Sequence, residues 1–94
     1  MLVERSELTV KDGAEEEFYA AITEKGVPLL QSVDGVISVQ VGRGVENPSK
    51  FMMLVGWQSM DAHTAYGGTP KSLELRGIMG PFLSGGAMEH FELT

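Results

Sequence analysis

The chain has 94 residues, a length that suits one domain with a single core. Hydrophobic residues make up 43% and charged residues 21%, which is ordinary globular composition and argues against disorder. There is no cysteine, so disulfides, thiolate metal sites and cysteine nucleophiles are excluded.

The charge balance disfavours two classes of partner. The formal net charge is -6, and the basic residues form no stripe that would neutralise nucleic acid or bind an anionic membrane surface. The N-terminus carries Glu4, Arg5 and Glu7 where a signal peptide would have an apolar core. We therefore expect a cytoplasmic protein with no nucleic-acid or membrane partner.

The first half of the chain predicts a strand, a helix and a second strand. The first strand covers residues 2–10, and Asp12 with Glu15 resembles a capping box at the start of the helix. Pro28 is expected to kink or divide this helix near Glu24, because proline lacks an N–H. The second strand is expected at 36–43. Two apolar faces should be buried, Phe18, Ile22, Leu29, Leu30 and Val33 on the helix, and Ile37, Val39 and Val41 on the second strand.

A turn at 46–49 joins the second strand to a third strand that has no polar face. Between Phe51 and Trp57 neither the odd nor the even positions carry a charge or a hydroxyl. A strand with one solvated face normally alternates apolar and polar residues, so this strand must be covered on both faces. In so short a chain helices can cover one face, and we expect a second copy of the protein to cover the other.

The last third of the chain predicts two capped helices and a final strand. Ser59 is typical of an N-cap for a short helix over residues 60–66. Thr69 and Pro70 are typical of the start of another helix that runs to about residue 79. The final strand is expected over residues 87–93.

This order of elements is β-α-β-β-α-β. It predicts one domain over residues 1–94, with an α+β, ferredoxin-like fold and a four-stranded antiparallel sheet.

Three segments carry a resemblance to a known family: TVKDGAEEEFYAA, DGVISVQVGRGVENPSKFMMLVGWQSMDAHTAY and GPFLSGGAMEHFE. They resemble the antibiotic biosynthesis monooxygenase (ABM) domain family, most specifically where Trp57 is followed by Ser59, Ala62, His63 and Tyr66. The resemblance covers nearly the whole chain. It implies a dimeric α+β barrel in which two sheets pack face to face, with a substrate cleft between helices and sheet in each subunit. Members of this family include cofactor-free oxygenases of quinols and polycyclic phenols, haem-degrading enzymes and proteins of unassigned role.

Three residues are candidates for catalysis. Trp57, at the cleft by resemblance, would stack on an aromatic substrate and orient an oxygen through its N–H, or it fills the core. His63 would accept a proton from a phenolic hydroxyl, or it lies solvated on the helix surface. His90 would act as a base or a hydrogen-bond donor, or it pairs with a carboxylate at the dimer rim.

Five more residues are expected to bind a small aromatic ligand: Tyr66, Met53, Met79, Phe82 and Arg76. Methionine adapts its shape, so a cleft lined by it suits flat ligands. Some quinone-forming members of the family place an asparagine four residues before the tryptophan, where this chain has Met53. Polar contacts to substrate or oxygen would then come from other residues.

The sequence contains no motif for a metal or an organic cofactor, so we expect neither. His63 and His90 lie on separate elements, and no spaced carboxylate motif joins either one. Haem-degrading relatives imply an axial histidine on the later helix and an asparagine in the first strand, and this chain has neither.

The leading hypothesis is a homodimeric, cofactor-independent monooxygenase. Its substrate would be an electron-rich hydroxyaromatic, resembling a quinol or an anthrone, in an apolar cleft between helices and sheet. The missing asparagine keeps open a non-catalytic, ligand-binding or stress-response protein on the same scaffold. An isomerase or a detoxifying enzyme for small carbonyl compounds, using His63 and His90, is a further alternative.

Overall fold

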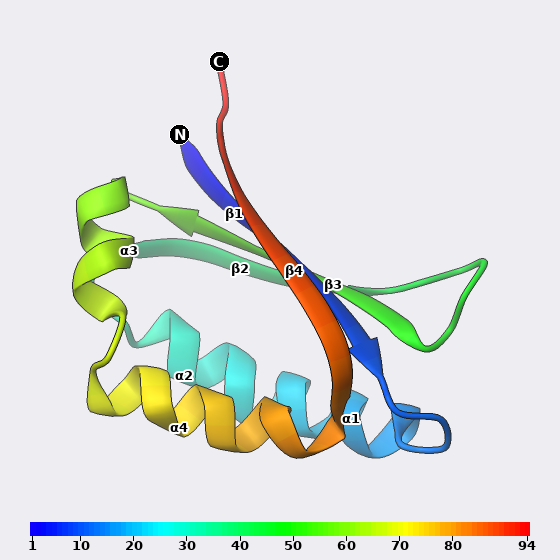
Figure 1. Cartoon of the computed structure of the whole chain (residues 1–94). Coiled ribbons are helices and arrows are strands. Elements are labelled where there is room, and N and C mark those ends of the chain that lie inside the picture. Colours follow the sequence, from blue (N-terminus) through cyan, green and yellow to red (C-terminus); the bar gives the residue numbers. More distant parts are fainter.

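Four strands form one antiparallel sheet, and the helices cover one of its faces (Figure 1). The computed structural model describes all 94 residues and has the βαββαβ order that the sequence predicts. In the sheet the order is β2-β3-β1-β4. The strands are β1 (Leu2–Val10), β2 (Val36–Arg43), β3 (Lys50–Trp57) and β4 (Leu83–Glu92).

The first helical stretch is divided, as predicted from Pro28. α1 (Glu15–Ala21) continues into a π-helical turn, Ile22–Gly26, and then into α2 (Val27–Gln31). A proline ring clashes with the carbonyl four residues earlier, and the wide π turn falls there. The predicted capping box is wrong. The N-cap is Ala14 and makes no side-chain bond, because Gly13, with φ at 86°, turns the chain and leaves Asp12 outside the first helical turn.

The second helical stretch begins at two side-chain caps, both as predicted. The Ser59 hydroxyl accepts from the Ala62 N–H at the start of α3 (Met60–Tyr66). The Thr69 hydroxyl accepts from the Ser72 N–H at the start of α4 (Pro70–Met79). No helix of the structure combines the length and the apolar character that crossing a bilayer requires.

The last strand begins earlier than predicted. A 3-10 turn, Gly80–Phe82, follows α4, and β4 starts directly at Leu83. Gly86 pairs with Leu8 inside the ladder, where a Cβ would come within 3.0 Å of the Glu7 carbonyl oxygen. Gly86 therefore suits the strand because it allows this close backbone approach.

The core lies between the sheet and the helices. Phe51, Met53, Val55 and Trp57 of β3 are at most 3% exposed. The predicted helix stripe is confirmed, with four of its members buried and Leu29 half-buried. The buried core residues are Leu2, Leu8, Val10, Phe18, Ile22, Leu30, Val33, Phe51, Met53, Val55, Trp57 and Leu75.

One core residue was predicted wrongly. Ile37 is 56% exposed, because a register irregularity between Val36 and Ser38 shifts it out of phase with Val39 and Val41. These two valines pack against the core as predicted.

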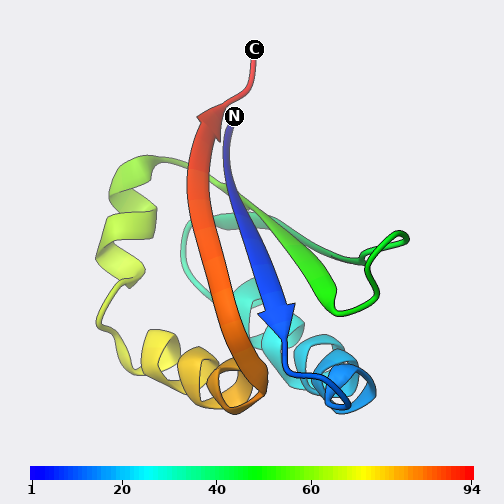
Figure 2. The ribbon, with the colours of Figure 1, turned by 45° about the vertical axis from the view of Figure 1, so that its right-hand side comes forward.

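The opposite face of the sheet carries no helix (Figure 2). Met52 is 37% exposed on this face, and Leu54 is half-buried between Arg5 and Gln40 of the neighbouring strands. A single chain thus covers β3 on one face only.

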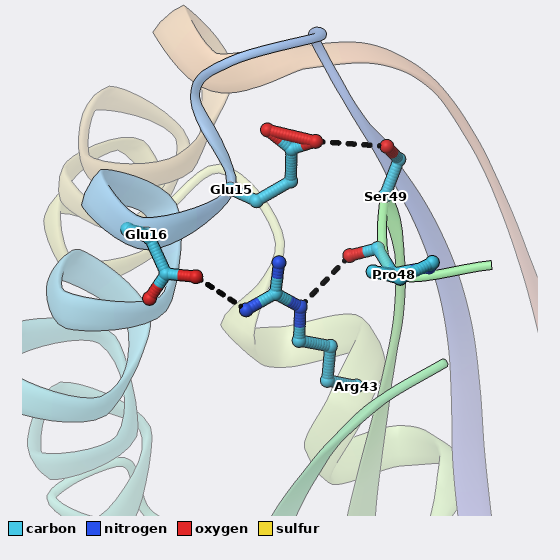
Figure 3. A network of polar contacts seen from close by, with 5 residues as sticks. All are labelled: Glu15, Glu16, Arg43, Pro48 and Ser49. Carbon is cyan, nitrogen blue, oxygen red and sulfur yellow. Dashed lines mark hydrogen bonds and ion pairs between the residues drawn. The ribbon is translucent and has the colours of Figure 1, made fainter. Parts of the chain in front are cut away.

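A polar network ties the start of α1 to the β2–β3 hairpin (Figure 3). Arg43 binds Glu16 at 2.7 Å and donates through Nε to the Pro48 carbonyl oxygen at 2.9 Å. The Ser49 hydroxyl donates to Glu15 at 2.9 Å. Hydrogen bonds from its own backbone amide and from Ser49 hold the pKa of Glu15 below its usual range.

Candidate active site

The sheet register brings a carboxylate and a histidine together on the helix-covered face. Glu4 of β1 pairs directly with His90 of β4, and on its other side with Val55 of β3. Directly paired residues on neighbouring strands have side chains on the same face. Glu4 is 8% exposed, so this face is the buried one.

His63, the second histidine, approaches Glu4 from α3. This helix begins three residues after Trp57, which places His63 one turn into the helix and against the indole ring. The ring centroids of Trp57 and His63 are 5.2 Å apart, at an interplanar angle of 83°.

Glu4, Trp57, His63 and His90 form a connected group, here called the Glu4 cluster. The indole N–H of Trp57 donates to Glu4 Oε1 at 2.9 Å, and His63 Nε2 lies 3.5 Å from the same oxygen. His63 Nε2 and His90 Nε2 face one another at 3.4 Å. The Ser6 hydroxyl donates to the second oxygen, Glu4 Oε2, at 3.4 Å.

The three catalytic candidates of the sequence analysis are therefore adjacent in space. The Trp57 N–H is bonded to the carboxylate, whereas the sequence-based hypothesis gave it the task of orienting an oxygen. The indole is completely buried, so it fills the core and fixes Glu4 at the same time.

Glu4 gives the cluster a negative charge without a lysine or arginine in contact with it. Burying a carboxylate is costly unless hydrogen bonds or an opposite charge compensate it. Here the donors are the indole N–H and the Ser6 hydroxyl.

Tyr66 adds an unpaired hydroxyl beside the cluster. Its ring centroid lies 5.5 Å from that of Trp57, and its Oη is buried without a hydrogen-bond partner. Burial raises the pKa of Tyr66. The nearby Ser72 side chain opposes this rise, although its geometry does not make a hydrogen bond to Oη. The Glu4 carboxylate raises the pKa further, and Arg76 lowers it. The raised pKa favours the neutral phenol, and its hydroxyl makes no hydrogen bond within the protein.

No hydrogen bond or ion pair joins the other predicted substrate residues to the Glu4 cluster. Met53 is a core residue, 3% exposed, and Arg76 is exposed on α4. Met79 and Phe82 pack against the core at the far end of α4, where Phe82 meets Phe18 edge-on at 6.1 Å.

Glu4 is the member of the candidate site that the sequence analysis missed. The alternation of β1 contained the signal, since Glu4 and Ser6 fall in phase with Leu2, Leu8 and Val10. A carboxylate on the apolar face of a strand needs a partner inside the protein.

The larger groove on the surface, of about 590 Å³, does not contain the histidines. It lies between α3, the α2–β2 turn and the start of α4, and it meets the surroundings of the cluster through Tyr66 and Ala62. We take the cluster as the candidate site because the groove has no histidine and a single carboxylate, Asp34. The groove is lined by Val33, Asp34, Gly35, Gln58, Ala62, Ala65, Tyr66, Thr69, Pro70 and Lys71.

A model of the ABM family, described as antibiotic biosynthesis monooxygenase, matches residues 1–76, and the chain belongs to this family. An uncharacterised protein of Bacillus subtilis, YczJ, is 27% identical over 94 residues and covers 98% of both chains.

Solved structures show the same fold. A protein from Bordetella bronchiseptica, assigned as an antibiotic biosynthesis monooxygenase, superposes with a TM-score of 0.91 at 22% identity, over 99% of this chain and 96% of that one. A variant of SnoaB, a cofactor-independent oxygenase from Streptomyces nogalater, superposes with a TM-score of 0.84 at 15% identity. The superposition covers 98% of this chain and 91% of SnoaB. The predicted family and the α+β fold of the dimeric barrels are thereby confirmed.

Proposed function

We propose that this protein is a cofactor-independent monooxygenase of an electron-rich hydroxyaromatic resembling a quinol or an anthrone. The observation that carries the proposal is the pair of facing histidine nitrogens, 3.4 Å apart, beside a buried carboxylate. The description of the family and the fold shared with a cofactor-independent oxygenase support it.

The reaction begins with the removal of a proton from the substrate. The His63–His90 pair accepts this proton, and Glu4 stabilises the resulting positive charge from 3.5 Å. Trp57 and Ser6 hold the carboxylate in place for this task. The free hydroxyl of Tyr66 suits the oxygen on which the negative charge of the substrate develops.

The electrons come from the substrate itself. With an anthrone, the carbanion gives one electron to O₂, and the radical and superoxide then couple and are protonated to a hydroperoxide. Loss of water leaves a carbonyl where the methylene stood, so CH₂ and O₂ become C=O and H₂O. The overall reaction therefore needs no external reductant.

Oxygen uptake by metal-free protein with an anthrone tests this function. Wild-type protein is expected to consume one O₂ per anthrone, and His63→Ala to lose about 10²–10⁴-fold in rate, the usual contribution of a general base. Thr64→Ala, an exposed neighbour on α3, is the matched control and should retain the rate. Equal rates for the two variants, or no uptake by folded wild-type protein, would refute the proposal.

A non-catalytic ligand-binding protein is the second candidate. It is favoured by the groove beside Tyr66, which could hold a small molecule without exposing it to the histidines. An aromatic ligand that binds tightly to wild-type protein and to His63→Ala alike, with no O₂ consumed, would favour this alternative.

A further inference from the structure

We infer that Glu4, His63 and His90 also form a three-ligand site for a divalent transition-metal ion such as Zn²⁺. The site would use His63 Nε2, His90 Nε2 and Glu4 Oε1. These ligand atoms lie within 4.8 Å of one another. The inference goes beyond the proposed function, because it concerns binding of an ion to the free protein.

The distances match a coordination shell better than they match hydrogen bonds. Zinc at 2.0–2.1 Å from tetrahedral ligands sets neighbouring ligand atoms about 3.3 Å apart. The distances from His63 Nε2 to His90 Nε2 and to Glu4 Oε1 are 3.4 Å and 3.5 Å. Hydrogen bonds between such atoms are usually shorter, at about 2.7–3.2 Å. The third distance, between His90 Nε2 and Glu4 Oε1, is the one that would have to shorten when an ion binds.

The carboxylate is already oriented by outer hydrogen bonds. Trp57 donates to the proposed ligand oxygen, and Ser6 donates to the other oxygen of Glu4. A carboxylate oxygen can accept one hydrogen bond and still bind a metal with its remaining lone pair. Partners of this kind fix ligand orientation and raise metal affinity.

The ligand set indicates which ions would bind. Two imidazoles and one carboxylate suit Zn²⁺ and neighbouring transition metals, whereas Mg²⁺ and Ca²⁺ prefer oxygen ligands alone. The His63 side chain is 19% exposed, so an ion can approach the cluster from solvent. Three protein ligands would leave a fourth position for water or another small ligand.

A bound ion would compete with proton transfer. Zn²⁺ would occupy the nitrogen lone pairs that the proposed function uses to accept a proton. Inhibition of turnover by Zn²⁺, reversed by a chelator, is therefore a consequence that rests on the proposed function. Binding of Zn²⁺ does not rest on it.

Calorimetric titration of chelator-treated protein with ZnCl₂, without substrate, tests the site. One ion per chain is expected, and His63→Ala, His90→Ala and Glu4→Gln should each weaken binding by more than about tenfold. Glu89→Gln is the matched control, because Glu89 adjoins His90 on β4 and is exposed. It should bind as wild-type protein does.

Cobalt supplies a second readout that a damaged fold would not imitate. Co²⁺ in wild-type protein should give the intense visible bands of a tetrahedral site, and these should be lost in His90→Ala protein whose far-UV circular dichroism is unchanged. Absence of stoichiometric Zn²⁺ binding by folded wild-type protein would overturn the inference. Affinity in the three ligand variants that is the same as in wild-type protein would overturn it too. Either result leaves the oxygen-uptake experiment unaffected, since that experiment uses metal-free protein.

Discussion

Glu4 shows why a single buried charge can mark a functional site. The packing of β1 would be served by an apolar residue at this position, since its in-phase neighbours Leu2, Leu8 and Val10 are core residues. The carboxylate instead accepts from Trp57 and Ser6 and lies beside a histidine. A carboxylate and two histidines that meet inside a fold are the kinds of side chain that carry proton-transfer chemistry, which is the reasoning behind our assignment.

Tyr66 gives a prediction at the same scale. A buried hydroxyl without a partner costs about 1–3 kcal/mol in protein mutational data, so Tyr66→Phe should leave stability near neutral pH unchanged or raise it by about 1 kcal/mol. Urea unfolding measures this difference. Tyr19→Phe, at a side chain 46% exposed, is the control and should change little.

The pH dependence of this pair of variants follows from the raised pKa. The pKa of Tyr66 is higher in the folded than in the unfolded protein. Its protonated form therefore contributes fully to folding stability below the ordinary tyrosine pKa of 10.0, and this contribution is lost as the pH rises through the pKa of the folded state. Wild-type protein should therefore lose stability relative to Tyr66→Phe above about pH 10. A hydroxyl with a strong partner would instead make Tyr66→Phe the less stable protein near neutral pH.

At the scale of elements, α3 is held against the sheet by the turn between α2 and β2. Gly35 in this turn has φ at 90°, and a Cβ there would lie 2.6 Å from the Ala62 Cβ on α3. Glycine is thus required both by the backbone conformation and by the close approach of the helix. Because α3 carries His63, this contact also sets the position of one half of the histidine pair.

A comparison of two glycines separates these effects. Gly13→Ala has the backbone strain alone, since φ is 86° and nothing lies within 4 Å of the added Cβ. It should cost about 1–2 kcal/mol. Gly35→Ala has the same strain plus the overlap with Ala62, so urea unfolding should find a larger loss, and near-UV circular dichroism should show a changed environment of Trp57. Equal losses would mean that α3 moves aside freely.

Elements governed by local chemistry were the predictable ones. Ser59 and Thr69 begin α3 and α4 because a hydroxyl placed before a helical pattern caps it whatever lies around it. Asp12 and Ile37 were misread because their outcome depends on a turn at Gly13 and on a strand irregularity, and neither leaves a clear local signal.

The candidate site was predictable only in part. Local reasoning identified His63, Trp57 and His90 as single residues, but not their contacts. The pairing of Glu4 with His90 depends on the register between the first and last strands, more than eighty residues apart in sequence. The expectation that no metal binds depended on sequence spacing alone, and the group of Glu4 with the two histidines removes that argument.

At the scale of the molecule, one face of the sheet remains uncovered by any element of the chain. Val3, Leu54 and Met52 lie on it, and Phe91, paired with Val3, is 42% exposed. Arg5 at its centre is balanced by Glu7 and Glu89. We propose that a second copy of the chain covers this face, in line with the dimeric barrel fold of the family.

Sedimentation at micromolar concentration tests the dimer. Wild-type protein should sediment as a dimer, and Leu54→Lys should be largely monomeric, because the new charge would be buried against the partner. Leu73→Lys is the control, since Leu73 is 58% exposed on α4, in the helix layer on the other side of the sheet. A monomeric wild-type protein would contradict the proposed assembly.

The chemical claim depends on one step, the removal of a proton from the substrate by the histidine pair. Exchange of the methylene hydrogens of an anthrone for deuterium, followed by NMR in D₂O under argon, isolates this step from the reaction with oxygen. The account predicts that wild-type protein accelerates the exchange, that Thr64→Ala does so equally, and that His63→Ala does not. Acceleration that survives in His63→Ala, or wild-type protein that consumes oxygen with anthrone but never speeds the exchange, would contradict it.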